Sequence, residues 1–178
     1  MTPAAETHPR ALRPTDVLKH EHRRIEERLA TLSEALELLG DRGAEVSVLD
    51  RIEEIATLID REMAVHHQKE EEGLFPVLGP YLDRELNLDG RIADHEDLKI
   101  MSGKFQAAID ECRADSNDLF AAQMLRGYGL YIVHLVLEHL LKEDQILFLV
   151  AEHCLSAEEE EEVFRRFGSI ETTDTEPH

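Results

Sequence analysis

The sequence predicts an all-α fold, an antiparallel up-down four-helix bundle with a short additional C-terminal helix. Four long stretches carry apolar residues at spacings of three and four positions, and none shows the strict alternation that is typical of strands. Glycine and proline residues end the first two stretches. The second half of the chain repeats histidines and glutamates of the first half at a constant offset, which indicates that one helix pair is used twice.

The first predicted helix runs from Thr15, a suitable N-cap after Pro14, to about Leu39, before a glycine-containing break at residues 40–43. Its apolar positions form one stripe, and His22 stands inside that stripe where a core residue is expected. The apolar members of the stripe are Leu18, Ile25, Leu29, Leu32, Leu36 and Leu39. A metal-ligating residue type thus replaces an apolar residue on the inward face.

The second predicted helix runs from about Ser47 to about Phe75, and a connector with prolines and a glycine follows at residues 76–87. One face carries Ile52, Ile55, Ile59 and Met63. The same spacing continues onto His66 and then Glu70. The inward stripe of this helix therefore also becomes polar near its end.

The third and fourth predicted helices run from about Asp89 to Arg113 and from about Ser116 to Cys154. Both carry inward stripes interrupted by ligand types. The third stripe contains Ile92, His95, Phe105, Ile109 and Cys112, and the fourth contains Leu125, Tyr128, Ile132, Leu135, His139, Glu143, Ile146 and Val150. A short fifth helix is predicted because Ser156 and Glu159 form a capping-box pattern ahead of Val163 and Phe167. We expect it to pack across one end of the bundle.

A single domain at residues 14–169 accounts for all these helices in the chain of 178 residues. Residues 1–13 and 170–178 contain proline, threonine and acidic residues without apolar periodicity, so we expect a flexible N-terminus and a flexible C-terminal tail.

The charge balance excludes several classes of partner. Thirty-nine acidic and nineteen basic residues give a formal net charge of -20, which repels phosphate backbones and anionic lipids. We therefore expect neither a nucleic-acid nor a membrane partner.

The two cysteines, Cys112 and Cys154, form no C-x-x-C motif or disulfide framework, and the N-terminal segment lacks the apolar region of a signal peptide. A cytoplasmic location is predicted.

The internal repeat brings the ligand types into one pattern. Adding 73 to the positions of His22, His66, Glu70 and Phe75 gives the positions of His95, His139, Glu143 and Phe148. Two such helix pairs form a bundle whose facing helices direct these side chains to one central volume. A single inward histidine is more often a hydrogen-bonded core residue, but burying four histidines and two glutamates without partners would cost several kcal/mol for each charged group. We therefore predict a metal site.

The ligand types limit the choice of metal. Imidazole and carboxylate ligands without thiolate suit iron, manganese or zinc, and glutamates that can bridge indicate two ions. In each H-x-x-x-E pair the glutamate lies one helical turn after the histidine on the same face, so both side chains can reach a common ion or bridge two ions.

Four motifs resemble those of the hemerythrin-like, or HHE cation-binding, family: the EH of Glu21 and His22, HHQKEEEGLFP, DHEDL and EHLLKEDQILF. The resemblance covers about residues 15–152. It implies a non-heme diiron centre, with oxo, hydroxo or carboxylate bridges between the two iron ions, and makes manganese or zinc less expected. The ligands that it implies are His22, His66, Glu70, His95, His139 and Glu143, with Glu70 and Glu143 as bridges.

Three further residues are interpreted through this resemblance. His67 adjoins His66 where some family members supply an additional ligand, so His67 is included in the predicted metal site. Oxygen-carrying members place a second histidine one turn after the histidine of the third helix, and Lys99 occupies that position here, which argues against simple oxygen transport. Asp144 stands where those carriers have an aspartate ligand, but the repeat favours Glu143.

The resemblance implies a protein that binds or reacts with a small oxidant, namely dioxygen, peroxide or nitric oxide, at a buried dinuclear centre. Two other interpretations stay open: a non-catalytic iron or oxygen sensor or iron-binding protein, and a structural zinc-binding scaffold. The sequence does not decide whether the protein turns over peroxide or nitric oxide as an oxidoreductase, and it leaves the oligomeric state and the electron donor open.

Overall fold

The computed structural model describes residues 11–39, 44–82 and 88–173, and every regular element in these ranges is helical. The long helices are α1 (Pro14–Glu37), α2 (Val46–Gln68), α4 (Leu88–Ala114) and α5 (Leu119–Lys142). The shorter elements are the π-helix η1 (Lys69–Leu74), α3 (Phe75–Leu78), the 3₁₀ turn η2 (Gly79–Tyr81), the π-helix η3 (Glu143–Leu147), α6 (Phe148–Cys154) and α7 (Ala157–Thr173). The prediction of an all-helical bundle is confirmed.

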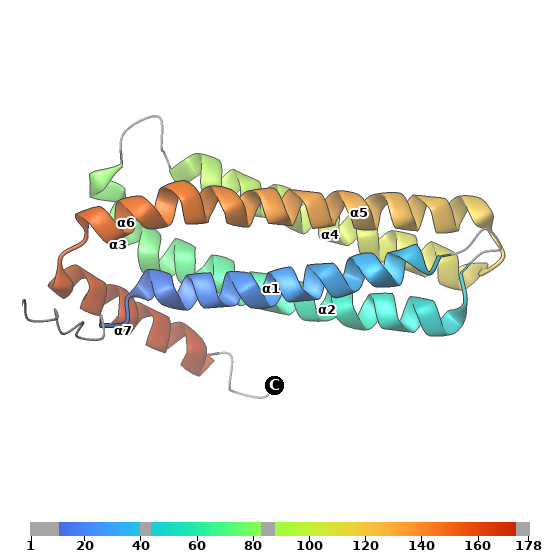
Figure 1. Cartoon of the computed structure of the whole chain (residues 1–178), viewed down its shortest axis with the longest axis horizontal. Helices are drawn as coiled ribbons and strands as arrows, with labels where there is room; N and C mark the ends of the chain where they lie inside the picture. The colour runs from blue at the N-terminus through green and yellow to red at the C-terminus, as the bar shows by residue number, and fades with distance from the viewer. Residues whose placement is uncertain (1–10, 40–43, 83–87, 174–178) are drawn as a thin grey trace, which may run out of the picture.

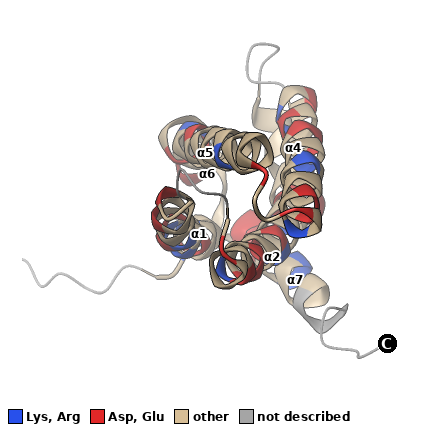
Figure 2. Cartoon of the chain, turned by 90° about the vertical axis from the view of Figure 1, so that its right-hand side faces the viewer, with Lys and Arg blue, Asp and Glu red and all other residues tan. Residues whose placement is uncertain are grey.

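The long helices lie side by side, and the chain reverses direction from each one to the next (Figure 1). Helix α1 packs against α2 and α5, and α4 packs against the same two helices. The end-on view in Figure 2 shows these four helices around a shared interior. Helix α7 packs against η1, α1 and α3 near one end of the bundle, the region in which the fifth helix was expected (Figure 1).

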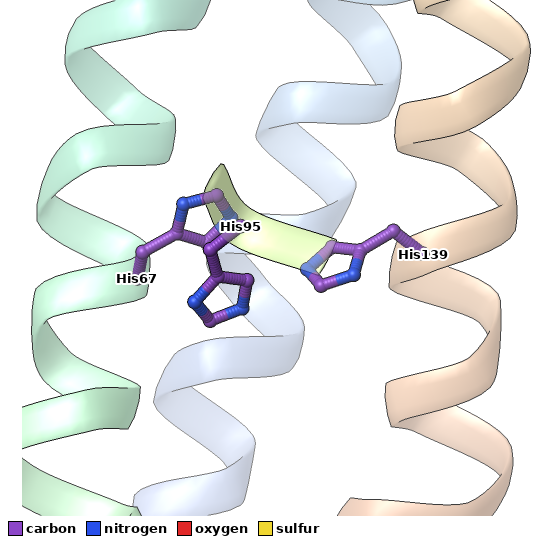
Figure 3. Close-up of side chains that lie close together, drawn as sticks. All are labelled: His67, His95 and His139. Carbon is purple, nitrogen blue, oxygen red and sulfur yellow. The ribbon is translucent and has the colours of Figure 1, made fainter. Parts of the chain in front are cut away.

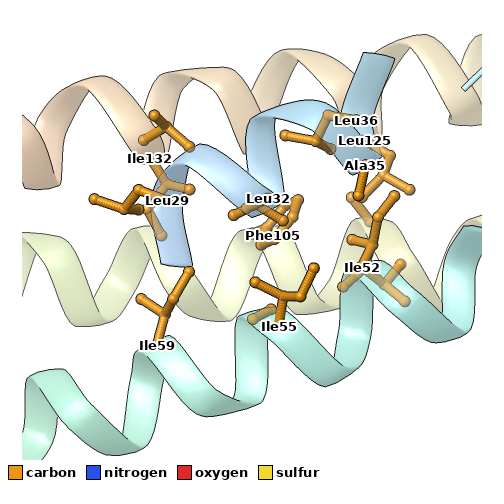
Figure 4. Packing of buried hydrophobic residues seen from close by; sticks show 14 of the residues in the cluster. Leu29, Leu32, Ala35, Leu36, Ile52, Ile55, Ile59, Phe105, Leu125 and Ile132 are labelled. Carbon is orange, nitrogen blue, oxygen red and sulfur yellow. The ribbon is translucent and has the colours of Figure 1, made fainter. Parts of the chain in front are cut away.

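The inward stripes of the long helices form the main core. Leu29, Leu32 and Leu36 of α1 are almost fully buried and face the isoleucines of α2 (Figure 4). Phe105 of α4 and Leu125 of α5 close the same cluster. Each such side chain contributes about 1.5–3 kcal/mol when it is withdrawn from water. The stripes read from the sequence therefore account for the packing of the four long helices.

The core is divided into two apolar clusters along the bundle. The larger one fills the interior between the long helices and begins at Ile25 on α1. The smaller one contains Leu18 together with residues from α3, α6 and α7, including Phe148 and Phe167. His22 lies in sequence between Leu18 and Ile25 and is 1% exposed. The polar residues predicted to bind metal therefore lie between two apolar layers.

Several helix starts differ from the prediction. Helix α1 begins at Pro14, with Arg13 rather than Thr15 as its N-cap, because proline fits the first helical position, where no amide donor is needed. Helix α5 begins at Leu119 rather than near Ser116, because the Asp118 carboxylate accepts hydrogen bonds from the next helical amides. The predicted break at residues 40–43 lies outside the described residues.

Two residues assigned to inward stripes are exposed. Ile146 is 45% exposed, because the π-helix η3 adds a residue to its turn and brings Leu147 inward instead. Ile92 is 40% exposed, because Leu88 and His95 make the inward side at this end of α4 and Ile92 lies beside them. The inward assignments of Ile92 and Ile146 are therefore wrong.

The predicted start of the C-terminal helix is confirmed, and the helix extends beyond its predicted end. The backbone amide of Ser156 donates to Glu159 Oε2 at 2.8 Å, and the amide of Glu159 donates to Ser156 Oγ at 3.4 Å, which forms the capping box. Helix α7 continues to Thr173 and buries Ile170, so ordered structure passes the boundary predicted at residue 169. Residues 1–10 and 174–178, where flexibility was predicted, lie outside the described residues.

The continuous helix Leu119–Cys154 is long and apolar enough to cross a membrane by length and composition. Its inward residues, including Leu125 and Leu140, pack in the bundle core. The core helix of a helical bundle satisfies the same criterion of length and composition.

Two glycines of α5 give a paired stability prediction. A Cβ atom at Gly129 would lie 2.5 Å from Leu36 Cδ1 and 2.9 Å from Phe105 Cε2, whereas one at exposed Gly127 would meet nothing within 4 Å. We expect Gly129→Leu to lower the free energy of unfolding by about 1–3 kcal/mol through overpacking. Gly127→Leu is expected to raise it by up to about 1 kcal/mol through helix propensity. Urea denaturation measures both, and equal effects would contradict the packing described here.

Candidate metal centre

The structure brings all six residues of the repeat into the bundle interior. They come from α1, α2, α4, α5 and the two π-helices, and each is at most 4% exposed. Their donor atoms form two groups, each with all atoms within 4.8 Å of one another: His22, His66 and Glu143 in one, and Glu70, His95, His139 and Glu143 in the other. Glu143 belongs to both groups, so the arrangement suits two adjacent ions.

The carboxylate of Glu143 lies between four imidazole rings. Its Oε2 atom is 3.4 Å from His22 Nε2 and 3.8 Å from His66 Nε2. Its Oε1 atom is 2.9 Å from His139 Nε2 and 3.7 Å from His95 Nε2. Each oxygen therefore faces a different pair of histidines, which is the geometry of a carboxylate that bridges two ions.

Glu70 lies beside the same rings. Its Oε2 atom is 3.3 Å from His95 Nε2 and 3.8 Å from His66 Nε2, so it faces one histidine of each pair. Together with Glu143 it supplies a second carboxylate in the position expected of a bridge.

Both carboxylates stand in π-helical turns. Glu70 lies in η1, directly after α2, and Glu143 opens η3, directly after α5. A π-helical turn contains one more residue than an α-helical turn and often marks a functional site. The two π-helices were not predicted from the sequence, because apolar spacing alone does not separate one wide turn from a regular helix.

Many buried polar atoms of this cluster have no well-directed hydrogen bond. Among the described residues, both oxygens of Glu70 and Glu143, both ring nitrogens of His139, and Nε2 of His95 lack one. Each such group costs about 1–3 kcal/mol when it is left unsatisfied. Metal coordination would satisfy these atoms, so the donor set fits bound cations.

The ring nitrogens of His22 and His66 also face a common point. Their Nε2 atoms are 3.0 Å apart. Two nitrogens that each lie roughly 2 Å from one ion, at about a right angle, are separated by roughly 3 Å. This pair is therefore spaced as two ligands of one ion.

Outer carboxylates orient three of the histidines. In each case a carboxylate from another helical segment bonds to Nδ1 and leaves Nε2 directed to the centre, as metal-ligating histidines require. The pairs are His22 with Asp144 Oδ1 at 3.1 Å, His66 with Glu21 Oε2 at 3.1 Å, and His95 with Glu71 Oε1 at 2.6 Å. Asp144, the alternative ligand, thus contacts the far side of the His22 ring.

Buried Lys69 adds a charge next to this arrangement. Its Nζ donates to Glu21 Oε1 at 2.6 Å, while the other oxygen of Glu21 bonds to His66. The roles of Glu21, Lys69 and Glu71 were missed by the sequence analysis. A signal existed for Glu71, because adding 73 to its position gives Asp144.

His67 lies on the His95 side of the centre. Its ring stacks on that of His95 with a centroid distance of 3.7 Å and an interplanar angle of 7°, and it meets His139 edge-on at 5.4 Å (Figure 3). Donor atoms of these three histidines form a third group within 4.8 Å. The structure therefore brings His67 to the same centre as the other predicted ligands, but on one half of it.

The two buried glutamates have opposite pKa shifts. Burial acts to raise the pKa of Glu143, but contacts with the four histidines outweigh burial and hold that pKa well below its usual value. Burial raises the pKa of Glu70, and the neighbouring charge of Glu143 raises it further. Glu143 is thus the carboxylate that more readily stays charged.

The histidines are shifted in both directions. Burial acts to lower the pKa of His66, but the charge of Glu70 and the contacts with Glu143 and Glu21 raise it to about 10. The pKa of His95 is also raised to about 10, because bonds to Glu143, Glu70 and Glu71 outweigh burial. Burial and the neighbouring charge of His95 lower the pKa of His67 to about 2, so its ring is neutral.

Metal loading is expected to release protons from His66 and His95. A protonated histidine ring must lose the proton on Nε2 before Nε2 can bind a metal ion. The proton on Nδ1 stays and is donated to the neighbouring carboxylate. Because both pKa values are about 10 without metal, these rings are protonated at pH 7, and the affinity for metal should rise with pH until about 10. We expect metal addition at pH 7 in weakly buffered solution to release at least two protons per chain. Release of none would contradict the protonation described here.

Comparison with known proteins agrees with this geometry. The family model of the hemerythrin HHE cation binding domain matches residues 13–151. No curated protein matches the sequence. The matched range contains all seven predicted ligands and both π-helices.

Proposed function

The chain belongs to the hemerythrin HHE cation-binding family, and from this we propose that it is a non-heme diiron protein. Its antiparallel up-down four-helix bundle would bind or react with a small oxidant, namely dioxygen, peroxide or nitric oxide. The position of Glu143 carries the proposal, because its two oxygens face different histidine pairs. A mononuclear site would have no need of this arrangement.

The residues of the centre fall into two sets, one for each proposed ion. His22 and His66 serve one position, and His95 and His139 serve the other, with His67 beside them. Glu70 and Glu143 neutralise part of the cationic charge and fix the spacing of the two positions. Bound iron would supply the electrons for reaction with the oxidant.

Iron is proposed over zinc or manganese on the basis of the family. Imidazole and carboxylate donors without a thiolate suit redox-active iron as well as manganese and zinc. Lys99 stands one turn after His95, where oxygen-carrying members of the family place a second histidine, and its side chain is exposed. We therefore propose reaction with the oxidant rather than simple oxygen transport.

A second candidate function is an iron or oxygen sensor. The buried atoms without hydrogen bonds favour it, because a site that is satisfied only by metal couples metal occupancy to the order of the bundle. Loss of helix on chelation, measured by circular dichroism, would support the sensor, and retention of full helix content would count against it.

The surroundings of the protein are part of the proposal. The net charge of -20 supports a protein without nucleic-acid or membrane partners, and we propose a cytoplasmic location with a small molecule as the partner.

Stopped-flow absorption tests the proposed reaction. The iron-loaded protein is reduced anaerobically and mixed separately with dioxygen, hydrogen peroxide and nitric oxide. We expect near-ultraviolet bands of the oxidised centre to return with dioxygen or peroxide, or a new visible band to form with nitric oxide. An unchanged spectrum with all three ligands would overturn the proposal.

A further inference from the structure

A cavity of about 420 Å³ opens between α2 and α4 and reaches the metal-binding residues. His67 and His95 line it on the side of the centre, and Ile132 and Val136 of α5 line it from across the bundle. The remaining lining includes Met63 and Leu98, and carboxylates toward its opening. Its volume falls within the range of roughly 300–1,000 Å³ that is typical of small-molecule sites. This space is much larger than a diatomic ligand requires.

The internal repeat shows that this opening is one-sided. Ser102 lines the cavity, and the position related to it by the offset of 73 is occupied by Leu29, which is 1% exposed. His67 corresponds in the same way to Leu140, which is 0% exposed. Both leucines belong to the main apolar core. At these two positions, small or polar residues on the α2–α4 side thus stand where the other half of the repeat has core leucines.

The chemistry of the cavity selects among ligands. Its inner part is apolar, formed by Met63, Leu98, Ile132 and Val136. Its lining also carries the carboxylates of Asp60, Glu71, Glu72 and Glu96, with Lys99 as the only basic side chain besides the two histidines. Ser102 Oγ donates to Asp60 Oδ1 at 2.6 Å, which holds that carboxylate at the rim. Anions are repelled by such a rim, whereas an uncharged molecule with an apolar body is accommodated.

We propose that this cavity is the substrate chamber of the centre and that it takes an uncharged organic hydroperoxide. The inference rests on the proposed diiron function and names its substrate class. The apolar body of the hydroperoxide lies on Met63 and Leu98, and its O–O–H group reaches the His67 and His95 side. In the reaction the O–O bond breaks, two protons are taken up, and the products are the alcohol and water. Two bound ferrous ions would supply the two electrons and would be oxidised to the ferric state.

Ligand binding tests the chamber without any turnover. The probes are 4-fluorobenzyl alcohol and 4-fluorobenzoate, which share size and shape but differ in charge, observed by fluorine NMR with the protein as purified. We expect the alcohol to bind at least tenfold more tightly than the benzoate. Equal binding of the two, or no binding of the alcohol, would overturn the chamber.

Filling the cavity provides the matched variants. Ser102→Leu places the leucine of the other half of the repeat into the cavity, and Gly103→Leu adds the same side chain at the next residue of α4, where a Cβ meets nothing within 4 Å. We expect Ser102→Leu to weaken alcohol binding at least tenfold and Gly103→Leu to leave it unchanged. If Ser102→Leu does not fold by circular dichroism, Ala64→Leu, which also lines the cavity, replaces it. Equal binding by the filled and control variants would contradict the proposal.

Kinetics on the reduced iron protein separate this inference from the function on which it rests. Ser102→Leu is expected to slow oxidation by cumene hydroperoxide at least tenfold relative to Gly103→Leu, with little change for hydrogen peroxide. Reaction with hydrogen peroxide but never with cumene hydroperoxide would overturn the chamber and keep the diiron function. Absence of reaction with either peroxide, together with absence of iron, would overturn the diiron function itself.

Discussion

Replacement of Glu143 by alanine is expected to remove at least one metal ion per chain. Its two oxygens face both histidine pairs at distances of 2.9 Å and 3.4 Å, so its loss removes a donor from each metal position. The same result is expected for Glu70→Ala, with Glu70 facing His66 and His95. Elemental analysis of the purified variants measures the effect.

The control for these variants is His134→Ala. His134 lies on the flank of the bundle, where its side chain is 65% exposed and its Nε2 atom is 3.5 Å from Glu138 Oε1. This variant should keep the metal content of the unmodified protein. Glu143→Gln, which preserves side-chain volume, separates the loss of charge from the loss of packing. Equal metal content in all the variants would rule out the ligand assignment.

Removal of the metal is expected to lower the thermal unfolding midpoint by roughly 10 °C. Binding at a thousand times the dissociation constant stabilises a fold by about 4 kcal/mol, and each kcal/mol corresponds to about 2–4 °C in a chain of this size. The metal-free centre retains partial compensation, because protonated His66 and His95 lie beside Glu143. That compensation is present below the unfolded histidine pKa and is lost as pH rises through about 10.

Thermal melts with and without chelator measure this effect at pH 7 and pH 9.5. The difference between metal-bound and metal-free protein should be larger at the higher pH, since His66 and His95 then begin to lose their protons. Glu143→Ala should show a reduced response to chelator. Identical unfolding midpoints before and after chelation would contradict a centre whose buried polar atoms are satisfied by bound metal.

The helices and the convergence of the six candidate ligands could be predicted from the sequence, because both depend on periodicity. Core positions such as Leu29 and Ile52 recur at helical spacing, and His22 and Glu143 occupy positions in the same stripes. The offset of 73 then related the two halves of the centre. The six residues of the repeat converge because the four long helices direct their inward faces to one shared interior.

Other features depended on local geometry that periodicity does not encode. The π-helical turn that begins at Glu143 exposes Ile146, which was predicted to face inward, and buries Leu147. The contact between Glu21 and His66 joins two helices through side-chain rotamers, which no spacing rule specifies. The cavity beside Ser102 becomes evident only when the packing of both halves is compared.

Metal content per chain, measured by elemental analysis on freshly purified protein together with its absorption spectrum in air and after reduction, tests the central claim most directly. A dinuclear iron centre predicts about two irons per chain, with near-ultraviolet bands that bleach on reduction. Zinc in place of iron, or metal-free protein with its helices intact, would contradict the claim and leave a structural helical scaffold.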